Sequence, residues 1–173
     1  MNVVLAEYSL APGASMTQIV AEIRMLIEHL AADRDKLGIV DRQIYLGGHS
    51  AGGHLAAMYR SHPAVAGVHM LSGIADLEPI GLCWLQNKLE LSSSEISNYS
   101  PLLHISKGAP TLISVGGEEL PEFMRQSAMY AEVCKNNGEH ISHILVPGAD
   151  HFGILNDLAD PEGRQLKAFM SLL

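Results

Sequence analysis

The sequence is poor in cysteine, in basic residues and in long apolar runs. Its two cysteines, Cys83 and Cys134, form no disulfide framework and fit a reducing cytoplasm. Lysine and arginine number 11 against 19 acidic residues, so the net charge is −8 and a surface for nucleic acid or anionic lipid is not expected. No apolar run reaches the length of a membrane span, and the first residues lack a secretory signal pattern. We therefore predict a cytoplasmic protein that binds neither nucleic acid nor membrane.

Charge is also scarce overall. Charged residues make up 17% of the 173 residues and apolar residues 47%, a composition typical of a globular protein with a sizeable core. No repeat, low-complexity tract or linker interrupts the chain. The length suits a single domain over residues 1–173.

Apolar runs alternate with segments of helical periodicity along the chain. Strands are predicted at residues 2–8, 43–46, 65–71, 110–115 and 141–146, and helices at residues 16–30 (ending near 33–37), 51–60, 121–135 and 162–172. Ser15 followed by Gln18 gives the first helix a capping-box pattern. Residues 73–106 show neither period, which predicts an irregular lid or binding loop. The alternation predicts an α/β fold, a three-layer sandwich with a mostly parallel sheet.

The stretch Gly48-His49-Ser50-Ala51-Gly52 lies between a predicted strand and a predicted alanine-rich helix. It fits the G-x-S-x-G nucleophile elbow, in which the serine occupies a strained strand-to-helix turn. A side chain at Gly48 or Gly52 is expected to collide with the neighbouring strand or helix. A short glycine motif can also be a mere flexible turn, but the flanking elements favour the elbow. We therefore predict that Ser50 is a nucleophile.

A serine hydroxyl needs a base, and the base needs a third group to orient it. Among nine histidines, His151 alone follows the last predicted strand, at the edge where open α/β sheets place their sites; the alternative is an ordinary loop histidine. In the chain order nucleophile, acid, base, the acid is expected after the fourth strand, where Glu119 is the first choice and Glu118 the second. Asp76 is a third, and both glutamates have the alternative role of favouring a helix N-terminus. His49 is expected to shape the pocket rather than to act as the base.

These residues resemble the α/β-hydrolase superfamily, particularly its arylformamidase (kynurenine formamidase) and small carboxylesterase branch. The elbow alone indicates a serine hydrolase, whereas the combination of residues 121–127 with 150–152 is more specifically similar to formamidases. In that branch the acid is usually aspartate at the position held here by Glu119. The stretches that carry the resemblance are 8–12, 47–53, 99–102, 116–123 with 125–127, and 150–152.

The resemblance implies a serine hydrolase of a small ester or an N-formyl arylamine, with no metal and no cofactor. Ser50 is then the nucleophile, His151 the proton shuttle, Glu119 the group that orients it, and the Ala51 N–H an oxyanion donor. The partner is a small-molecule substrate. Residues that we expect to line its pocket are His49, Trp84 and Tyr99.

The resemblance also predicts that one oxyanion donor is missing. The fold takes a second oxyanion donor from a His-Gly-Gly loop, and this motif does not occur in the chain. Relatives carry three strands, a helix and that loop ahead of the segment at 8–12, so the sequence resembles the C-terminal two-thirds of a hydrolase. Losing one donor costs about a hundred- to a thousand-fold in rate. The alternative function is therefore a truncated, catalytically impaired hydrolase-like domain.

The resemblance also has a consequence for the sheet. In the family another strand lies between the predicted strands at 2–8 and 43–46, so here these two either pair directly or leave an edge exposed. An exposed edge favours association. We expect poor solubility or a homo-oligomer, and a sharp monomer peak with cooperative unfolding would contradict this expectation.

Overall fold

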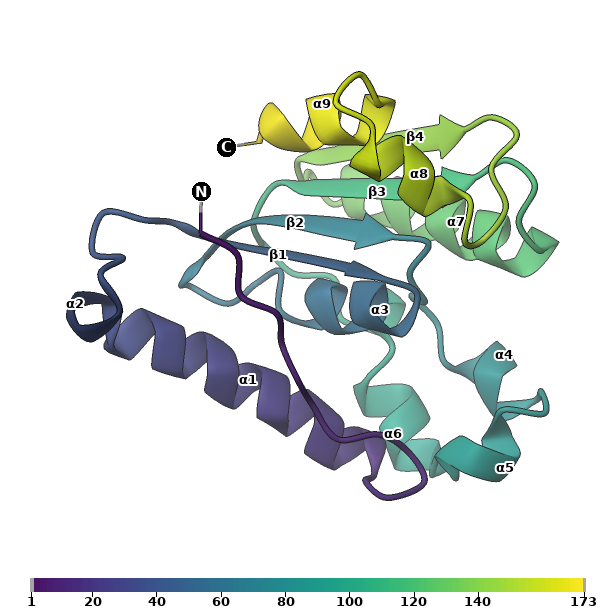
Figure 1. Ribbon diagram of the computed structural model, residues 1–173. Helices are drawn as coiled ribbons and strands as arrows, with labels where there is room; N and C mark the ends of the chain where they lie inside the picture. Colours follow the sequence, from purple (N-terminus) through teal and green to yellow (C-terminus); the bar gives the residue numbers. More distant parts are fainter. Residues whose placement is uncertain (1, 173) are drawn as a thin grey trace.

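The computed structural model describes residues 2–172 and contains a parallel sheet covered by helices on both faces (Figure 1). In this range four strands form one sheet in the order β1-β2-β3-β4. The strands are β1 (Ile44–His49), β2 (Val65–Leu71), β3 (Thr111–Gly116) and β4 (Ile141–Val146). The predicted α/β sandwich with a parallel sheet is confirmed.

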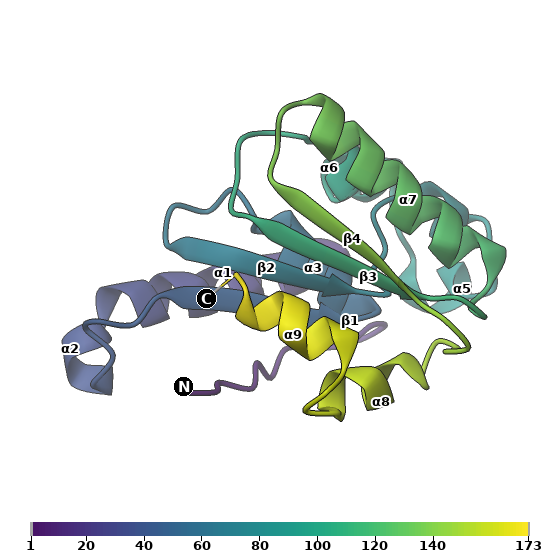
Figure 2. The same cartoon turned by 90° about the horizontal axis from the view of Figure 1, so that it is seen from above.

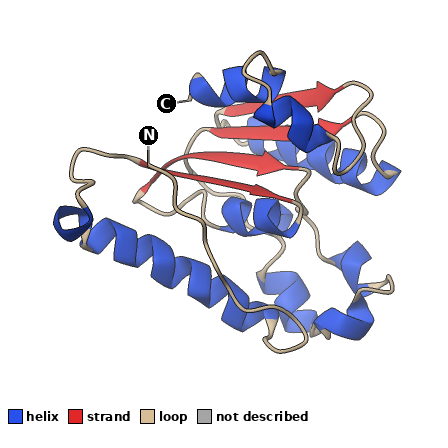
Figure 3. Cartoon of the chain, viewed as in Figure 1, coloured by secondary structure: helices blue, strands red, loops and turns tan. Residues whose placement is uncertain are grey.

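The helices fall into two layers and a side cluster (Figures 2 and 3). On one face of the sheet lie α1 (Met16–Ala32), α3 (Ala51–Met58) and α7 (Pro121–Asn136). The other face carries α8 (Ile154–Ala159) and α9 (Arg164–Met170). The remaining helices are short: α2 (Arg34–Leu37), α4 (Glu78–Gly81), α5 (Gln86–Leu89), α6 (Ser93–Asn98) and the 3-10 turn η1 (Pro101–Leu103).

The carboxyl ends of the strands meet at one edge of the sheet. His49 of β1 pairs with Leu71 of β2, and Gly116 of β3 pairs with Val146 of β4. The turns that follow β1, β3 and β4 therefore leave the sheet side by side, as parallel connectivity requires. This alignment brings together residues that are far apart in the sequence.

Most predicted elements are present. Strands β2 and β4 have the predicted bounds, and α1 begins with the predicted capping box between Ser15 and Gln18. Two expectations were wrong in detail. The segment 73–106 holds α4, α5, α6 and η1 rather than a wholly irregular loop, and α8 follows β4 where no helix was predicted. Four-residue helices such as α4 are too short to show a hydrophobic period.

The strand predicted at residues 2–8 is wrong. These residues have no strand conformation, and Val3 and Leu5 are 73% and 90% exposed. The segment passes the β1 side of the sheet and is tied instead to α1, where Ser9 N–H donates to Glu22 Oε2 at 2.7 Å (Figure 1). An apolar run forms a strand only where its backbone groups pair with those of a neighbouring strand, and residues 2–8 pass β1 without joining the sheet. Within residues 2–172, β1 pairs with β2 alone, so its outer edge has no strand partner.

None of the helices between residues 2 and 172 is both long enough and apolar enough to cross a membrane. The longest, α1, is amphipathic, and it buries Ile19, Val20, Ile23 and Ile27 in a core shared with α3 and β2. A second core joins α3 to α7 across β2 and β3 through Met70, Ile113 and Tyr130. The two clusters fix α1, α3 and α7 against one face of the sheet.

Stability should fall in acid because of a histidine buried in the sheet. His69 of β2 stacks on Phe169 of α9, with ring centroids 5.5 Å apart, and its Nε2 lies 2.5 Å from Ser114 Oγ. Burial lowers the pKa of His69 to about 4. The unfolded chain takes up this proton near pH 6.5, so the free energy of unfolding falls as pH drops from about 6.5 to about 4, by about 3 kcal/mol in all. Above pH 6.5 the contribution is complete.

Urea unfolding of the wild type and of His69→Gln at several pH values between 4 and 8 tests this expectation. Glutamine can still hydrogen-bond to Ser114 but does not titrate, so the variant should lose less stability on acidification. Burial also lowers the pKa of His54, which leaves a residual slope in both proteins. Equal losses in the two proteins would contradict the assignment.

Candidate active site

Ser50 stands between β1 and α3 in a strained turn. Its backbone has φ 56° and ψ −116°, in the left-handed half of conformational space that side chains disfavour. The turn is held by the Ser50 N–H, which donates to Leu71 O at 2.9 Å, and by the Ser50 carbonyl, which accepts from His54 N–H at 3.1 Å. Ala51 is the first residue of α3, so its N–H has no acceptor within the helix.

The glycines around Ser50 differ in what they permit. A Cβ on Gly48 would lie 2.3 Å from the backbone carbonyl carbon of Gly52, so no side chain fits there. The collision expected at Gly52 is absent, because a Cβ at Gly52 points into open space. The constraint falls on Gly53 instead, where a Cβ would lie 2.9 Å from both Gly48 O and Gly73 Cα. The expectation for Gly52 was wrong because the rotation of the first helical turn decides which glycine faces the strand.

Alanine at these two glycines should therefore have opposite effects. Gly48→Ala is expected to destabilise the fold by about 3 kcal/mol, because the clashing atoms belong to the backbone and cannot move aside. Gly52→Ala, within α3, should be neutral or stabilising by up to about 1 kcal/mol. Urea unfolding of the two variants measures the difference. Equal stabilities would mean that the elbow does not adopt this geometry.

Three side chains form a hydrogen-bonded line at the carboxyl edge of the sheet. His151, which follows β4, has Nδ1 2.7 Å from Glu119 Oε2 and Nε2 3.1 Å from Ser50 Oγ. A carboxylate only accepts, so the neutral imidazole carries its proton on Nδ1 and leaves Nε2 to accept the Ser50 hydroxyl. This arrangement can withdraw a proton from an attacking alcohol, as acyl transfer requires.

Glu119 is the acid in this line, and its carboxylate is fully buried. Its Oε1 accepts from Gly116 N–H at 2.8 Å and from the hydroxyl of Ser72, while Oε2 faces His151. The other acids considered from the sequence lie elsewhere. Glu118 is exposed, and Asp76 lies 3.9 Å from the guanidinium of Arg125.

His49 contacts the loop that carries His151. Its Nε2 is 2.7 Å from the carbonyl oxygen of His151, and the two rings have centroids 4.5 Å apart. Burial lowers the pKa of His49. The ring is therefore neutral near pH 7, and Nε2–H donates to the carbonyl of the loop that carries His151.

Aromatic rings surround His151, and besides the predicted His49 they include two phenylalanines that were not predicted. Phe123 and Phe152 have ring centroids 4.4 and 5.2 Å from that of His151. Among the described residues, the rings in contact with His151 do not include Trp84 or Tyr99, the other two residues expected in the pocket. Trp84 is 74% exposed in the turn between α4 and α5, and Tyr99 packs against the core formed by α1 and α3. The signal for the two phenylalanines was present in the stretches 121–127 and 150–152 that carried the resemblance.

Two hollows open at different ends of the sheet. One, of about 260 Å³, lies beside the site between the sheet and α8 and α9, and is lined by Gly47, Gly48, His49, His69, Leu71, Leu155, Leu158 and Phe169. The larger, of about 420 Å³, is lined by residues 105–107 and 137–139, at the amino ends of β3 and β4. Ser50 and His151 lie at the carboxyl edge, so the larger hollow is remote from them.

The described residues contain no set of side chains suited to bind a metal ion. Between residues 2 and 172, no three side chains of histidine, cysteine, aspartate or glutamate are grouped so that they could hold a metal ion. His49 and His151 are neighbours, but His49 Nε2 and both ring nitrogens of His151 contact protein atoms.

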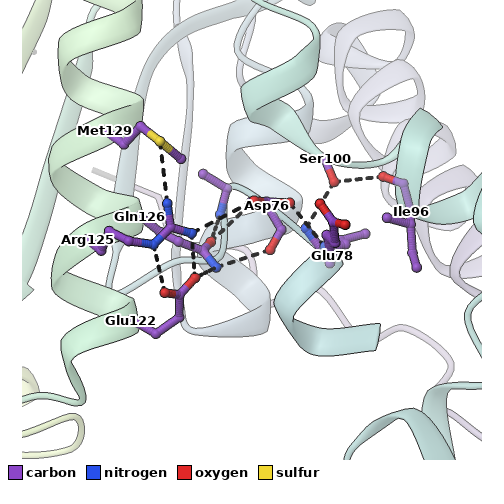
Figure 4. Close-up of polar contacts among 10 residues, drawn as sticks. Asp76, Glu78, Ile96, Ser100, Glu122, Arg125, Gln126 and Met129 are labelled. Atoms are coloured by element: carbon purple, nitrogen blue, oxygen red, sulfur yellow. Dashed lines mark hydrogen bonds and ion pairs between the residues drawn. The ribbon is translucent and has the colours of Figure 1, made fainter. Parts of the chain in front are cut away.

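The loop after β2 is fixed to the helix that follows Glu119 (Figure 4). Gln126, buried in α7, accepts the N–H groups of Ala75 and Asp76 on Oε1, both at 2.9 Å, and donates Nε2–H to Asp76 O at 3.1 Å. On the other side Ser100 Oγ accepts the Leu77 N–H at 2.9 Å. The first residues of the segment 73–106 are therefore held to α7 and to Ser100.

Comparison with known proteins gives consistent matches. A family model described as the alpha/beta hydrolase fold matches residues 1–155. Kynurenine formamidase of Danio rerio is 28% identical over 185 residues, covering 99% of this chain and 62% of the relative. Kynurenine formamidase of Salmo salar is 30% identical over 173 residues, covering 91% of this chain and 58% of the relative.

Solved structures give the same fold. An esterase from Pyrobaculum calidifontis superposes with a TM-score of 0.80 at 21% identity, over 96% of this chain and 64% of the esterase. At that identity the likeness shows the fold alone. The chain spans 62% and 58% of the length of the two curated relatives described above.

Proposed function

The chain belongs to the α/β-hydrolase family, and from this premise we propose that it hydrolyses a small carboxylic ester or an N-formyl arylamine through an acyl-enzyme. The observation that carries the proposal is the continuous line from Ser50 Oγ through His151 to Glu119. Hydrogen bonds of this length and order turn a serine hydroxyl into a nucleophile at neutral pH.

In the first half-reaction, Ser50 Oγ attacks the carbonyl carbon of the substrate and His151 Nε2 takes the hydroxyl proton. Glu119 then faces the imidazolium on Nδ1 and stabilises its charge. The tetrahedral oxyanion accepts the Ala51 N–H at the start of α3. When the carbon–oxygen or carbon–nitrogen bond breaks, His151 returns the proton to the leaving alcohol or amine, and the acyl group stays on Ser50.

The second half-reaction uses the same groups with water. Water attacks the acyl carbon, His151 accepts a proton from it, and the bond to Ser50 Oγ breaks as the hydroxyl is regenerated. The product is a carboxylic acid, which is formate when the substrate is an N-formyl arylamine. No redox change occurs, and each proton taken up by His151 in one half-reaction is released in the same half-reaction.

Two observations support a substrate with an aromatic part. Phe123 and Phe152 lie against His151, and Phe152 is largely exposed, so a ring entering the site has apolar surface to cover. The relatives with the sequence matches described above are named kynurenine formamidase. An aryl ester and an N-formyl arylamine both present a ring next to the bond that breaks.

Covalent labelling with a fluorophosphonate probe tests the proposal directly. The purified protein is expected to label, and an excess of aryl ester should compete with the probe. Parallel assays of aryl ester hydrolysis and of formate release from N-formylkynurenine then separate the two substrate classes. A folded protein that neither labels nor turns over either substrate would contradict the proposal and support the impaired alternative.

A further inference from the structure

A serine that the sequence did not single out lies at the end of β2. Ser72 is 1% exposed, and its backbone has φ 46°, one of few left-handed residues here that are not glycine. Its hydroxyl donates to Glu119 Oε1, and its N–H donates to Ser114 O at 2.7 Å. A serine in this conformation is strained, and such strain persists where the surroundings require it.

The two oxygens of the Glu119 carboxylate have different hydrogen-bond partners. Oε1 is held by two donors, Ser72 Oγ–H and Gly116 N–H, while Oε2 is directed at His151. Glutamate has one more rotatable bond than aspartate, so its carboxylate needs more restraint to keep one orientation. Without the Ser72 hydroxyl, Gly116 alone would hold Oε1.

The backbone next to Ser72 also contacts Ser50. Leu71, the residue before Ser72, accepts the Ser50 N–H on its carbonyl at 2.9 Å. Gln126 holds the backbone at Asp76 a few residues beyond (Figure 4). The end of β2 therefore touches both ends of the line that runs from Ser50 to Glu119, and its position is fixed from the far side by α7.

We propose that Ser72 is a positioning residue that aims the carboxylate of Glu119 at His151, and that its left-handed backbone is retained because it points the hydroxyl at Oε1. This role rests on the proposed hydrolase function and acts through Glu119, not on the substrate. It predicts a loss of Ser50 reactivity when the hydroxyl is removed, with little change in substrate binding.

Three variants distinguish the effect of the Ser72 hydroxyl from the effect of the strained Ser72 backbone. Ser72→Ala removes the hydroxyl and keeps a side chain at positive φ. Ser72→Gly removes the hydroxyl and relieves the strain, so it should be the more stable of the two. Ser114→Ala is the matched control, because Ser114 is equally buried but its hydroxyl contacts His69. Both Ser72 variants are expected to label about 10- to 100-fold more slowly than wild type, with KM for an aryl ester nearly unchanged.

A double-mutant cycle distinguishes positioning from general support. In a Glu119→Gln background, Ser72→Ala should slow labelling by less than about threefold, because the carboxylate that Ser72 aims at His151 is absent. Equal losses in both backgrounds, or a loss in Ser114→Ala as large as that in Ser72→Ala, would overturn the inference.

A readout without turnover separates this inference from the proposed function. The proton between His151 Nδ1 and Glu119 is expected to give a downfield NMR resonance, which its loss in Glu119→Gln would assign. Ser72→Ala should shift or broaden that resonance, whereas Ser114→Ala should leave it unchanged. If the wild type does not label at all, the proposed hydrolase activity fails while the resonance still decides the role of Ser72. An unaltered resonance in Ser72→Ala would refute that role.

Discussion

Replacing Ser50 with alanine is expected to reduce kcat/KM for an aryl ester by about 10,000-fold or more. Alanine has no nucleophilic atom, so His151 can at most assist direct attack by water on the substrate. The strained turn should survive, because its backbone hydrogen bonds to Leu71 and His54 use the peptide groups of residue 50 and not its hydroxyl. Fluorophosphonate labelling should vanish in the same variant.

The controls for this result are a fold check and a serine elsewhere. Far-UV circular dichroism and urea unfolding should match the wild type within about 1 kcal/mol. Ser142→Ala, at an exposed position of β4, should label and turn over substrate like the wild type. If Ser50→Ala retained turnover and labelling, the nucleophile would be another residue and the mechanism would be wrong.

Much of the fold was predictable because the relevant signals are local. The run at Val65–Leu71 is flanked by His62-Pro63 before it and Gly73 after it, and the structure has the strand with those bounds. The segment at 2–8 shows where this reasoning fails. It is as apolar as a strand, but a strand also needs a neighbour to pair with. No local sequence pattern predicts whether that segment pairs with the edge of β1.

The candidate site likewise contains residues that the sequence could predict and residues that it could not. The elbow is contiguous in sequence, and Glu119 and His151 were inferred because each follows a strand that ends at the same edge. Ser72 carried no such signal, since its contact with Glu119 depends on a positive φ and on the packing of β2 against β3. Tyr99 was expected to line the pocket, and its partly buried side chain packs against the core formed by α1 and α3. Aromatic character alone does not distinguish these two environments.

Glu119→Gln is expected to lower kcat by about 10,000-fold while the fold is preserved, and the reason is the hydrogen bonding around the carboxylate. Ser72 Oγ–H and Gly116 N–H both donate to Oε1, so a glutamine must place its carbonyl oxygen there. Its NH2 group then faces His151 Nδ1 and donates to it. The imidazole is forced into the tautomer with the proton on Nε2, which can no longer accept the hydroxyl of Ser50.

Glu118→Gln is the matched control, because it makes the same change one residue away on an exposed side chain. It should keep kcat within about twofold of wild type, whereas Glu119→Gln should lose kcat with KM nearly unchanged. Steady-state hydrolysis of an aryl ester by the two variants, each compared with wild type at equal folded concentration, gives the answer. A reversed pattern would assign the acid to Glu118. Similar small losses in both variants would show that Ser50 and His151 act without a carboxylate, and that the buried carboxylate of Glu119 serves the fold alone.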